Sequence, residues 1–378
     1  QAWFNRVVLS NRVLVWFGLI SFPLYLWHWP LLSFARIIES ETPTRGIRLA
    51  AIALAILLAW LTYRLIEKPL RFGKQGRAKT IVLLVLMGVV GFAGYNDFKR
   101  DGLGFRFPGG QFFSDYFENS LPEQRYFGRL GLAEKYRDEC NFYDMERYKA
   151  RQGTVIPRES IARSCFARDA LFKKAVLIWG DSHAQQLNYG VTKYLPSDWQ
   201  VLQVASSGCA PALISETSTS NWCEQSNWFA LKAIKEAQPD VVVVAQNLGH
   251  NLNTMSEIAM QLTKMGVKKV IFTGPSPHWT TYLPKLVLKK LWFNTPRRTY
   301  IGIDKKVLDD NADLQKGFKQ TDTVKFVNLI NLFCNDQGCL TYIGEDIKVG
   351  ITTWDYGHLT PISSEYLARA LLVKLIVE

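Results

Sequence analysis

Residues Ala175-Val-Leu-Ile-Trp-Gly-Asp-Ser-His183 run from an unbroken apolar segment into a turn that contains a serine. A short apolar run of this kind favours a buried strand, and His183-Ala-Gln-Gln-Leu-Asn188 favours a helix directly after it. Ser182 is then expected at a helix N-terminus, where unpaired backbone N–H groups stabilise developing negative charge. The stretch therefore predicts an α/β fold with a nucleophile at the end of a strand.

Four more apolar runs follow, with helical segments between them. They are Gln200–Ala205, Val241–Ala245, Lys269–Thr273 and Val324–Leu329. Strands that alternate with helices predict a doubly wound, mostly parallel sheet, in which a site forms at the carboxyl ends of the strands. Ser363–Val377 has the pattern of a closing amphipathic helix.

A second short sequence, Asp355-Tyr-Gly-His358, lies near the end of the chain. A serine nucleophile needs a histidine to take its proton and an acid to orient that histidine. Either sequence alone could be an ordinary turn, but the order Ser182, Asp355, His358 after strand-like runs favours acyl transfer. Asp181 is a poor choice for the acid, because adjacency to Ser182 on a tight turn keeps its carboxylate from a distant imidazole.

The serine turn differs from the Gly-x-Ser-x-Gly elbow of the α/β-hydrolases, because residue 184 is Ala. It resembles instead the first block of the SGNH (GDSL-like) hydrolase superfamily, whose serine, glycine, asparagine and histidine lie on four sequence blocks. The resemblance implies a flavodoxin-like α/β domain. It also implies Ser182 as nucleophile, His358 as general base and Asp355 as the acid that orients the base.

The same resemblance implies an oxyanion hole. Gly208, after the run that ends at Ala205, matches the glycine whose backbone N–H acts beside that of Ser182, and Asn247 matches the asparagine whose side chain completes the hole. One such donor is worth about 3 to 4 kcal/mol of barrier. The third block departs from the Gly-x-Asn-Asp of the family, since Ala245 and Leu248 replace its glycine and aspartate.

No catalytic role is predicted for three further histidines. His183 is expected to point away along the new helix, in a structural or substrate-facing role. His250 and His278 follow apolar runs and are expected at the surface or lining a pocket. No metal site is predicted, because the chain has no Cys-x-x-Cys spacing.

The first hundred residues have a different composition. Val13–Phe34 is almost uncharged and long enough to cross a hydrocarbon core, which takes about 20 residues. Leu49–Tyr63 and Thr80–Tyr95 are shorter apolar runs that could be core helices, but three in succession favour membrane spans. The basic loop between the second and third should stay cytoplasmic. The chain after about residue 97 is then expected outside the inner membrane, in the periplasm.

All six cysteines lie in the part that this topology exports. An even number in an oxidising compartment predicts disulfides, with fifteen connectivities open. Pairing between sequence neighbours is expected, which gives Cys140–Cys165, Cys209–Cys223 and Cys334–Cys339.

The net charge of +12 could indicate a nucleic-acid partner. None is predicted, because part of the excess lies in the cytoplasmic loop and no nucleic-acid module is recognisable. A basic exported surface could face anionic lipid or anionic glycan instead.

The membrane part carries a second resemblance. Ser21-Phe-Pro-Leu-Tyr-Leu-Trp-His28-Trp-Pro30, followed by Tyr63-Arg-Leu-Ile-Glu67-Lys-Pro69-Leu-Arg71, resembles the end of the acyltransferase-3 membrane family. Its members acylate cell-envelope sugars, and one branch carries an SGNH domain behind an extra transmembrane helix. The implied organisation is two last membrane helices at 1–72, a basic loop and extra helix at 73–96, a periplasmic extension packed on the catalytic domain at 97–165, and an SGNH domain at 166–378.

This second resemblance implies a function. An acyl group, expected to be acetyl, would pass from a donor, with acetyl-CoA serving the full-length membrane domain, to a hydroxyl of an envelope glycan such as lipopolysaccharide O-antigen. The chain starts at Gln1 and is expected to be a C-terminal fragment, so the earlier membrane helices count among its partners beside the lipid bilayer.

Two other functions stay open. An esterase would use the same residues with water as acceptor, because transfer depends on excluding water. A non-catalytic glycan-binding domain on a membrane stem is the second. His28 is a candidate membrane-site residue, as an ionisable group within a span, or else part of an interfacial Trp-His-Trp belt before Pro30.

Overall fold

The computed structural model describes residues 10–39, 42–72, 76–100, 128–144, 158–214, 221–291 and 294–378. The chain forms two compact units, Gln1–Gly109 and Gly110–Glu378. Much of the predicted extension, at 101–127 and 145–157, lies outside the described residues.

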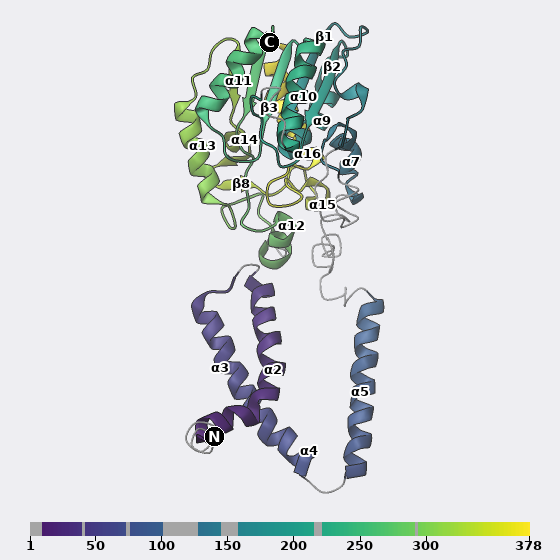
Figure 1. Ribbon diagram of the computed structural model, residues 1–378, viewed down its shortest axis with the longest axis vertical. Coiled ribbons are helices and arrows are strands. Elements are labelled where there is room, and N and C mark those ends of the chain that lie inside the picture. The colour runs from purple at the N-terminus through teal and green to yellow at the C-terminus, as the bar shows by residue number, and fades with distance from the viewer. Residues whose placement is uncertain are drawn as a thin grey trace. The chain divides into compact units, whose positions relative to one another are not determined.

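The first unit contains three long helical segments. They comprise α2 (Arg12–Glu39), α3 (Arg45–Thr62) continued through a π-helical turn (Tyr63–Glu67) into α4 (Lys68–Phe72), and α5 (Gly76–Lys99) (Figure 1). All three are long and apolar enough to cross a membrane, which confirms the predicted apolar helices. Their observed ends extend beyond the apolar runs; Thr44, for example, caps α3 through a bond from the Ile47 N–H (3.5 Å).

Helices α2 and α3 pack against each other. The indole N–H of Trp27 donates to the Thr62 hydroxyl (2.9 Å), and Ile20, Ala55 and Ala59 are buried. Small residues such as these two alanines let helix backbones approach closely in membrane proteins. Large apolar side chains elsewhere on these helices are exposed, and α5, described over its full length, buries none of its residues. Such surfaces suit lipid better than water.

The second unit is built on a five-stranded parallel sheet in the order β2-β1-β3-β4-β6. Its strands are β1 (Lys174–Gly180), β2 (Trp199–Ala205), β3 (Val241–Ala245), β4 (Lys269–Thr273) and β6 (Val324–Val327). The five predicted strands are confirmed, and the order is that of a flavodoxin-like sheet. The last strand is shorter than predicted because Asn328 caps the helix α14 (Leu329–Phe333), its side chain accepting from the Asn331 N–H (2.9 Å).

Helices cover both faces of this sheet (Figure 1). Leu177 and Trp179 face one buried cluster, and Val176 and Ile178 face the other, which explains the unbroken apolar run of β1. The first cluster includes α10 (Trp222–Ala237) and α11 (Leu252–Lys264). The second includes α9 (Ser182–Tyr194) and the closing helix, observed as α16 (Pro361–Leu367), a π-helical turn (Ala368–Leu372) and α17 (Val373–Val377). Helix α13 (Lys305–Gly317) precedes β6.

A small antiparallel sheet was not predicted. It consists of β5 (Arg298–Thr299), β8 (Gly338–Leu340) and β7 (Cys334–Asn335). Strands of two or three residues carry too little periodicity to be recognised in sequence. All three expected disulfides are confirmed, and Cys334–Cys339 joins β7 to β8.

The described part of the predicted extension packs on the sheet. It contains α7 (Leu132–Lys135) and a 3-10 turn (Asp138–Cys140). Asn141 forms a parallel bridge with Ala205 of β2, and Phe142 lies in the first core cluster. This segment therefore belongs to the body of the second unit.

Candidate active site

The nucleophile turn depends on a close approach of two strands. A Cβ at Gly180 would lie 1.8 Å from the carbonyl oxygen of Ala245, so only glycine lets β1 end beside β3. Asp181 then caps α9, its Oδ1 accepting from the His183 N–H (2.7 Å). Ser182 is the first residue of α9, and its backbone N–H has no partner within the helix.

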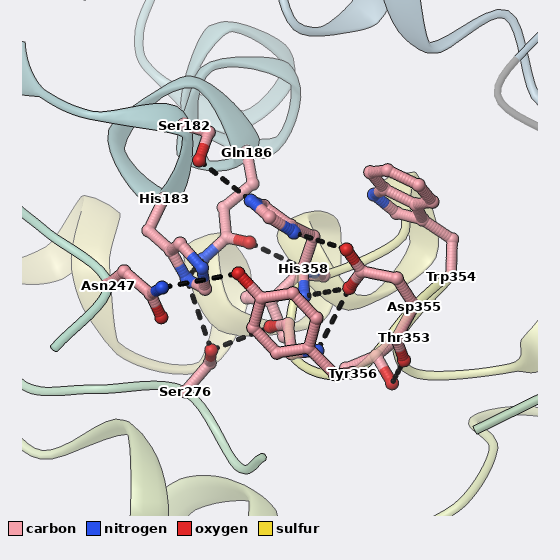
Figure 2. Close-up of polar contacts among 12 residues, drawn as sticks. Ser182, His183, Gln186, Asn247, Ser276, Thr353, Trp354, Asp355, Tyr356 and His358 are labelled. Carbon is pink, nitrogen blue, oxygen red and sulfur yellow. Dashed lines mark hydrogen bonds and ion pairs between the residues drawn. The ribbon is translucent and has the colours of Figure 1, made fainter. Parts of the chain in front are cut away.

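The structure brings the three predicted triad residues together (Figure 2). Nε2 of His358 lies 2.7 Å from the Ser182 hydroxyl, and Nδ1 lies 2.6 Å from Oδ2 of Asp355. The other carboxylate oxygen accepts from the N–H groups of Gly357 (2.9 Å) and His358 (2.7 Å). Because Nδ1–H must donate to the carboxylate, Nε2 is left to accept the serine proton.

Charge supports this assignment of roles. Burial alone would lower the pKa of His358, which is 9% exposed, but the adjacent Asp355 carboxylate raises it overall above the usual value. Burial alone would raise the pKa of Asp355, yet the imidazole and the two backbone N–H groups hold it below its usual range. The acid therefore stays ionised, and the base is free to accept a proton only above an elevated pH.

The predicted oxyanion residues lie at the ends of the neighbouring strands. Gly208 follows β2 with φ +82°, a conformation that favours glycine. Asn247 follows β3, and its backbone N–H donates to Oδ2 of Asp181 (2.8 Å). One carboxylate thus holds both the nucleophile turn and the Asn247 loop. Burial raises the pKa of Asp181 to about 6.

Sequence reasoning rejected Asp181 as the triad acid, and its carboxylate indeed serves other donors. It missed the role of Asp181 as a cap that also binds Asn247. An aspartate directly before a predicted helix is a recognisable N-cap signal, so half of that role could have been found.

Two unpredicted side chains hold the Asn247 amide. Its two ends lie 3.2 Å from the Tyr356 hydroxyl and 2.7 Å from Nε2 of His278 (Figure 2 shows the contact with Tyr356). Nδ1 of His278 lies 2.7 Å from the Ser276 carbonyl oxygen. Burial lowers the pKa of His278. The amide nitrogen of Asn247 donates to the Tyr356 hydroxyl, and its amide oxygen lies next to Nε2 of His278.

His278, expected at the surface or lining a pocket, does not lie at the surface. It is only 5% exposed, because the loop after β4 packs against the turn that contains Asp355. There the backbone N–H of Trp279 donates to the Tyr356 carbonyl (2.7 Å). His250 does line a cavity, of about 550 Å³, beside the Asn247 loop. Its Nε2 donates to the Thr273 carbonyl (3.0 Å), and burial lowers its pKa to about 4.

The predicted direction of His183 was wrong. Its ring centroid lies 4.2 Å from that of His358 and 5.6 Å from that of His278, on which it stacks. The first turn of α9 packs against the base loop, since the side-chain oxygen of Gln186 accepts from the Leu359 N–H (2.7 Å). Burial lowers the pKa of His183, so the structural reading fits a neutral ring.

His28 lies in α2 of the first unit, where its Nδ1 is 3.0 Å from the Leu24 carbonyl oxygen. Because a carbonyl oxygen can only accept, Nδ1 is the donor in this contact. Its functional role stays a prediction.

A doubly wound α/β unit with a Ser–His–Asp series at the switch point of its sheet has the arrangement that serine nucleophilic catalysis requires. Comparison makes this specific: the profile of the SGNH domain (fused to AT3 domains) matches residues 139–372. The chain belongs to this family.

Comparison with individual proteins covers less. Two curated proteins of Staphylococcus aureus, from strains COL and MRSA252, carry the provisional name O-acetyltransferase and are 37% and 39% identical over 78 residues. That match covers 20% of this chain and only 12% of each relative. The solved periplasmic domain of a Salmonella ser. Paratyphi A lipopolysaccharide acetyltransferase matches with TM-score 0.53 and 21% identity, over 66% of this chain and 97% of that one. At this identity the likeness confirms the fold.

Proposed function

We propose that the second unit transfers an acetyl group to a hydroxyl of a cell-envelope polysaccharide such as lipopolysaccharide O-antigen. The observation that carries the proposal is the hydrogen-bonded series Ser182, His358, Asp355 at the start of α9. The family assignment and the names of the Staphylococcus and Salmonella proteins support the acyl group and the class of acceptor.

In the first half-reaction, the Ser182 oxygen attacks the carbonyl carbon of the donor while its proton passes to Nε2 of His358. The charge that develops on the carbonyl oxygen is stabilised by the N–H groups of Ser182 and Gly208 and by the Asn247 amide. Collapse of the tetrahedral intermediate breaks the bond to the leaving group, which takes the proton from His358. An acyl-serine remains.

In the second half-reaction, a sugar hydroxyl gives its proton to Nε2 of His358 and its oxygen attacks the acyl carbonyl carbon. The bond to the Ser182 oxygen then breaks, and that oxygen recovers the proton. Both halves start from a neutral His358. Because Asp355 raises the pKa of this histidine, activity should rise with pH through a value above 6.5.

The donor and the location complete the proposal. Acetyl-CoA would supply the membrane part of the full-length protein, and the second unit would work on the periplasmic side of the inner membrane. Three apolar helices and the basic segment between the second and third support this topology. His28 would handle a proton at Nε2, the nitrogen not directed at Leu24.

Hydrolysis of the acyl-serine by water competes with transfer to a sugar, and the exposure of Ser182 favours it. Ser182 is partly exposed, so water can reach an acyl group on its oxygen. An esterase would then use the same three residues, with water in place of the sugar hydroxyl.

The test uses the whole chain in detergent with p-nitrophenyl acetate, with and without a lipopolysaccharide-derived polysaccharide. Ser182→Ala is compared with Ser256→Ala, which alters an exposed serine on α11. Acetylated polysaccharide that depends on Ser182 supports the transferase. Acetate release that depends on Ser182 but is not diverted by polysaccharide identifies an esterase. Equal activity in Ser182→Ala contradicts the proposal.

A further inference from the structure

A buried tyrosine outside the SGNH sequence blocks contacts the loop of the general base. The Tyr136 hydroxyl donates to the Leu359 carbonyl (2.5 Å), one residue after His358. It also accepts from the indole N–H of Trp354 (2.9 Å), one residue before Asp355. A single hydroxyl therefore joins the two ends of the sequence that carries acid and base.

Trp354 links the Tyr136 hydroxyl to the imidazole ring of His358. Its ring lies nearly parallel to that of His358, with centroids 5.3 Å apart and an interplanar angle of 26°. Figure 2 shows Trp354 beside His358 and Asp355. The indole orientation is fixed by the bond to Tyr136, so the tyrosine acts on the base through the tryptophan as well as through Leu359. Tyr136 is 3% exposed, and burial raises its pKa, which keeps the hydroxyl protonated and able to donate.

Five residues further along, Asn141 contacts the oxyanion turn. Its side-chain oxygen accepts from the Ser207 N–H (3.1 Å), and its nitrogen donates to the Ser207 hydroxyl (3.0 Å). That hydroxyl donates in turn to Gln185 of α9 (3.1 Å). Ser207 directly precedes Gly208, so Asn141, which is 1% exposed, fixes this glycine's turn relative to the nucleophile helix.

The segment that carries both residues is itself anchored to β2. Gln203, fully buried on that strand, donates to the Tyr136 carbonyl (2.9 Å), and the Phe142 N–H donates to the Ala205 carbonyl (2.9 Å). Between them, Cys140 is closed in a disulfide with Cys165. The profile of the family begins at residue 139, so Tyr136 lies outside the part of the chain that it matches.

We propose that Tyr136 and Asn141 are positioning residues of the active site. Tyr136 fixes the loop that carries His358, and Asn141 fixes the turn that carries Gly208. Neither touches the reacting atoms. The short stretch from Tyr136 to Asn141 thus contacts the active site on both its base side and its oxyanion side. This inference rests on the proposed serine chemistry.

The test measures kcat, KM and the pH dependence of Ser182-dependent ester cleavage in the whole chain. Tyr136→Phe should lower kcat about tenfold with KM unchanged, since a buried carbonyl and a buried indole N–H both lose their partner. It should also move the acid limb of the pH profile, where kcat rises as His358 loses its proton, to lower pH. The reason is that His358 would be held less firmly against Asp355, which lowers the pKa of the histidine. Asn141→Ala should lower kcat about tenfold and leave the acid limb in place.

Control variants distinguish a failure of this positioning role from a failure of the proposed serine chemistry. Tyr300→Phe removes a bond of the same kind at an exposed position, from a tyrosine hydroxyl to the Asn335 carbonyl (2.7 Å), and should leave kcat and the pH profile unchanged. If Ser182→Ala abolishes activity while Tyr136→Phe matches Tyr300→Phe, the positioning role is wrong. If Ser182→Ala stays active, the serine chemistry itself is wrong. Should Tyr136→Phe fail to fold, Trp354→Phe removes the same indole bond and must shift the acid limb.

Discussion

On the base side of the candidate site, His358 and Asp355 are buried, and three residues form two hydrogen bonds of 2.6 and 2.7 Å. On the oxyanion side, Gly208 is exposed and Asn247 is partly exposed. On the base side, the contacts between acid and base lie within one short loop, from Asp355 to His358. The oxyanion side is held by contacts from several loops far apart in the chain.

The oxyanion side is also the part of the site that departs from the motif implied by the resemblance. The third block carries Ala245 and Leu248 where the resemblance implied glycine and aspartate, yet Asn247 keeps three contacts, with Asp181, Tyr356 and His278. Support from other loops replaces the local motif. If Asn247 acts as the proposed oxyanion donor, its position matters and not which loops support it.

The largest expected effect tests the base side. Asp355→Asn should lower kcat about ten-thousandfold, because His358 would take the wrong tautomer. With the carboxylate gone, the pKa of His358 should fall, so the remaining activity should persist to lower pH. The measurement is kcat across pH 5 to 9.

Asp346→Asn is the matched control, since Asp346 is exposed and its side chain caps a short helix by accepting from the Lys348 N–H (2.8 Å). It should behave as the unaltered chain. A loss of less than tenfold in Asp355→Asn would mean that the imidazole is oriented by other contacts.

The second effect tests the oxyanion side. Asn247→Ala should lower kcat by about a hundredfold to a thousandfold, the usual cost of one oxyanion donor, and leave the acid limb in place. Kinetics with p-nitrophenyl acetate measure both. Asn253→Ala, an exposed asparagine on α11, serves as the control. A change below threefold would leave oxyanion stabilisation to the backbone N–H groups alone.

The residues of the base side could be predicted from the sequence more completely than the contacts that support the oxyanion side. Ser182, Asp355 and His358 were predictable because each lies in a short sequence with its own local chemistry. The strands before Ser182, Gly208 and Asn247 were predictable from their apolar runs. These elements fix the fold and the order in which the residues meet at the sheet edge.

The supports of Asn247 were not predictable. His278 and Tyr356 reach it from 31 and 109 residues away, through loops whose paths depend on tertiary packing. The same holds for Tyr136, which contacts Leu359 across 223 residues. Contacts of this kind leave no periodicity in the sequence, so only the structure reveals them.

The third effect tests Asp181, whose carboxylate binds both the nucleophile turn and the Asn247 loop. The pKa of Asp181 is about 6 in the folded chain against an ordinary 3.8, because the carboxyl is buried. Such a group favours folding most below pH 3.8, and this contribution is lost as pH rises through 6. Relative to Asp181→Asn, which cannot titrate, the unaltered chain should lose about 3 kcal/mol of folding free energy over this range.

Denaturant unfolding followed by tryptophan fluorescence, at pH values from 4 to 7, measures this difference. Asp355, whose pKa is lowered, gives the opposite trend, but it is present in both proteins and cancels. A difference that stays constant with pH would mean that Asp181 is already ionised at pH 4.

The smallest effect tests whether the distant supports act through Asn247. His278→Ala should lower kcat about tenfold, since the Asn247 amide loses one of its two side-chain partners. In the Asn247→Ala background the same change should have no further effect, because the group that His278 orients is gone. This double-mutant cycle isolates the coupling between the two residues. Equal tenfold losses in both backgrounds would mean that His278 acts elsewhere, through its stacking on His183 and hence on the base side.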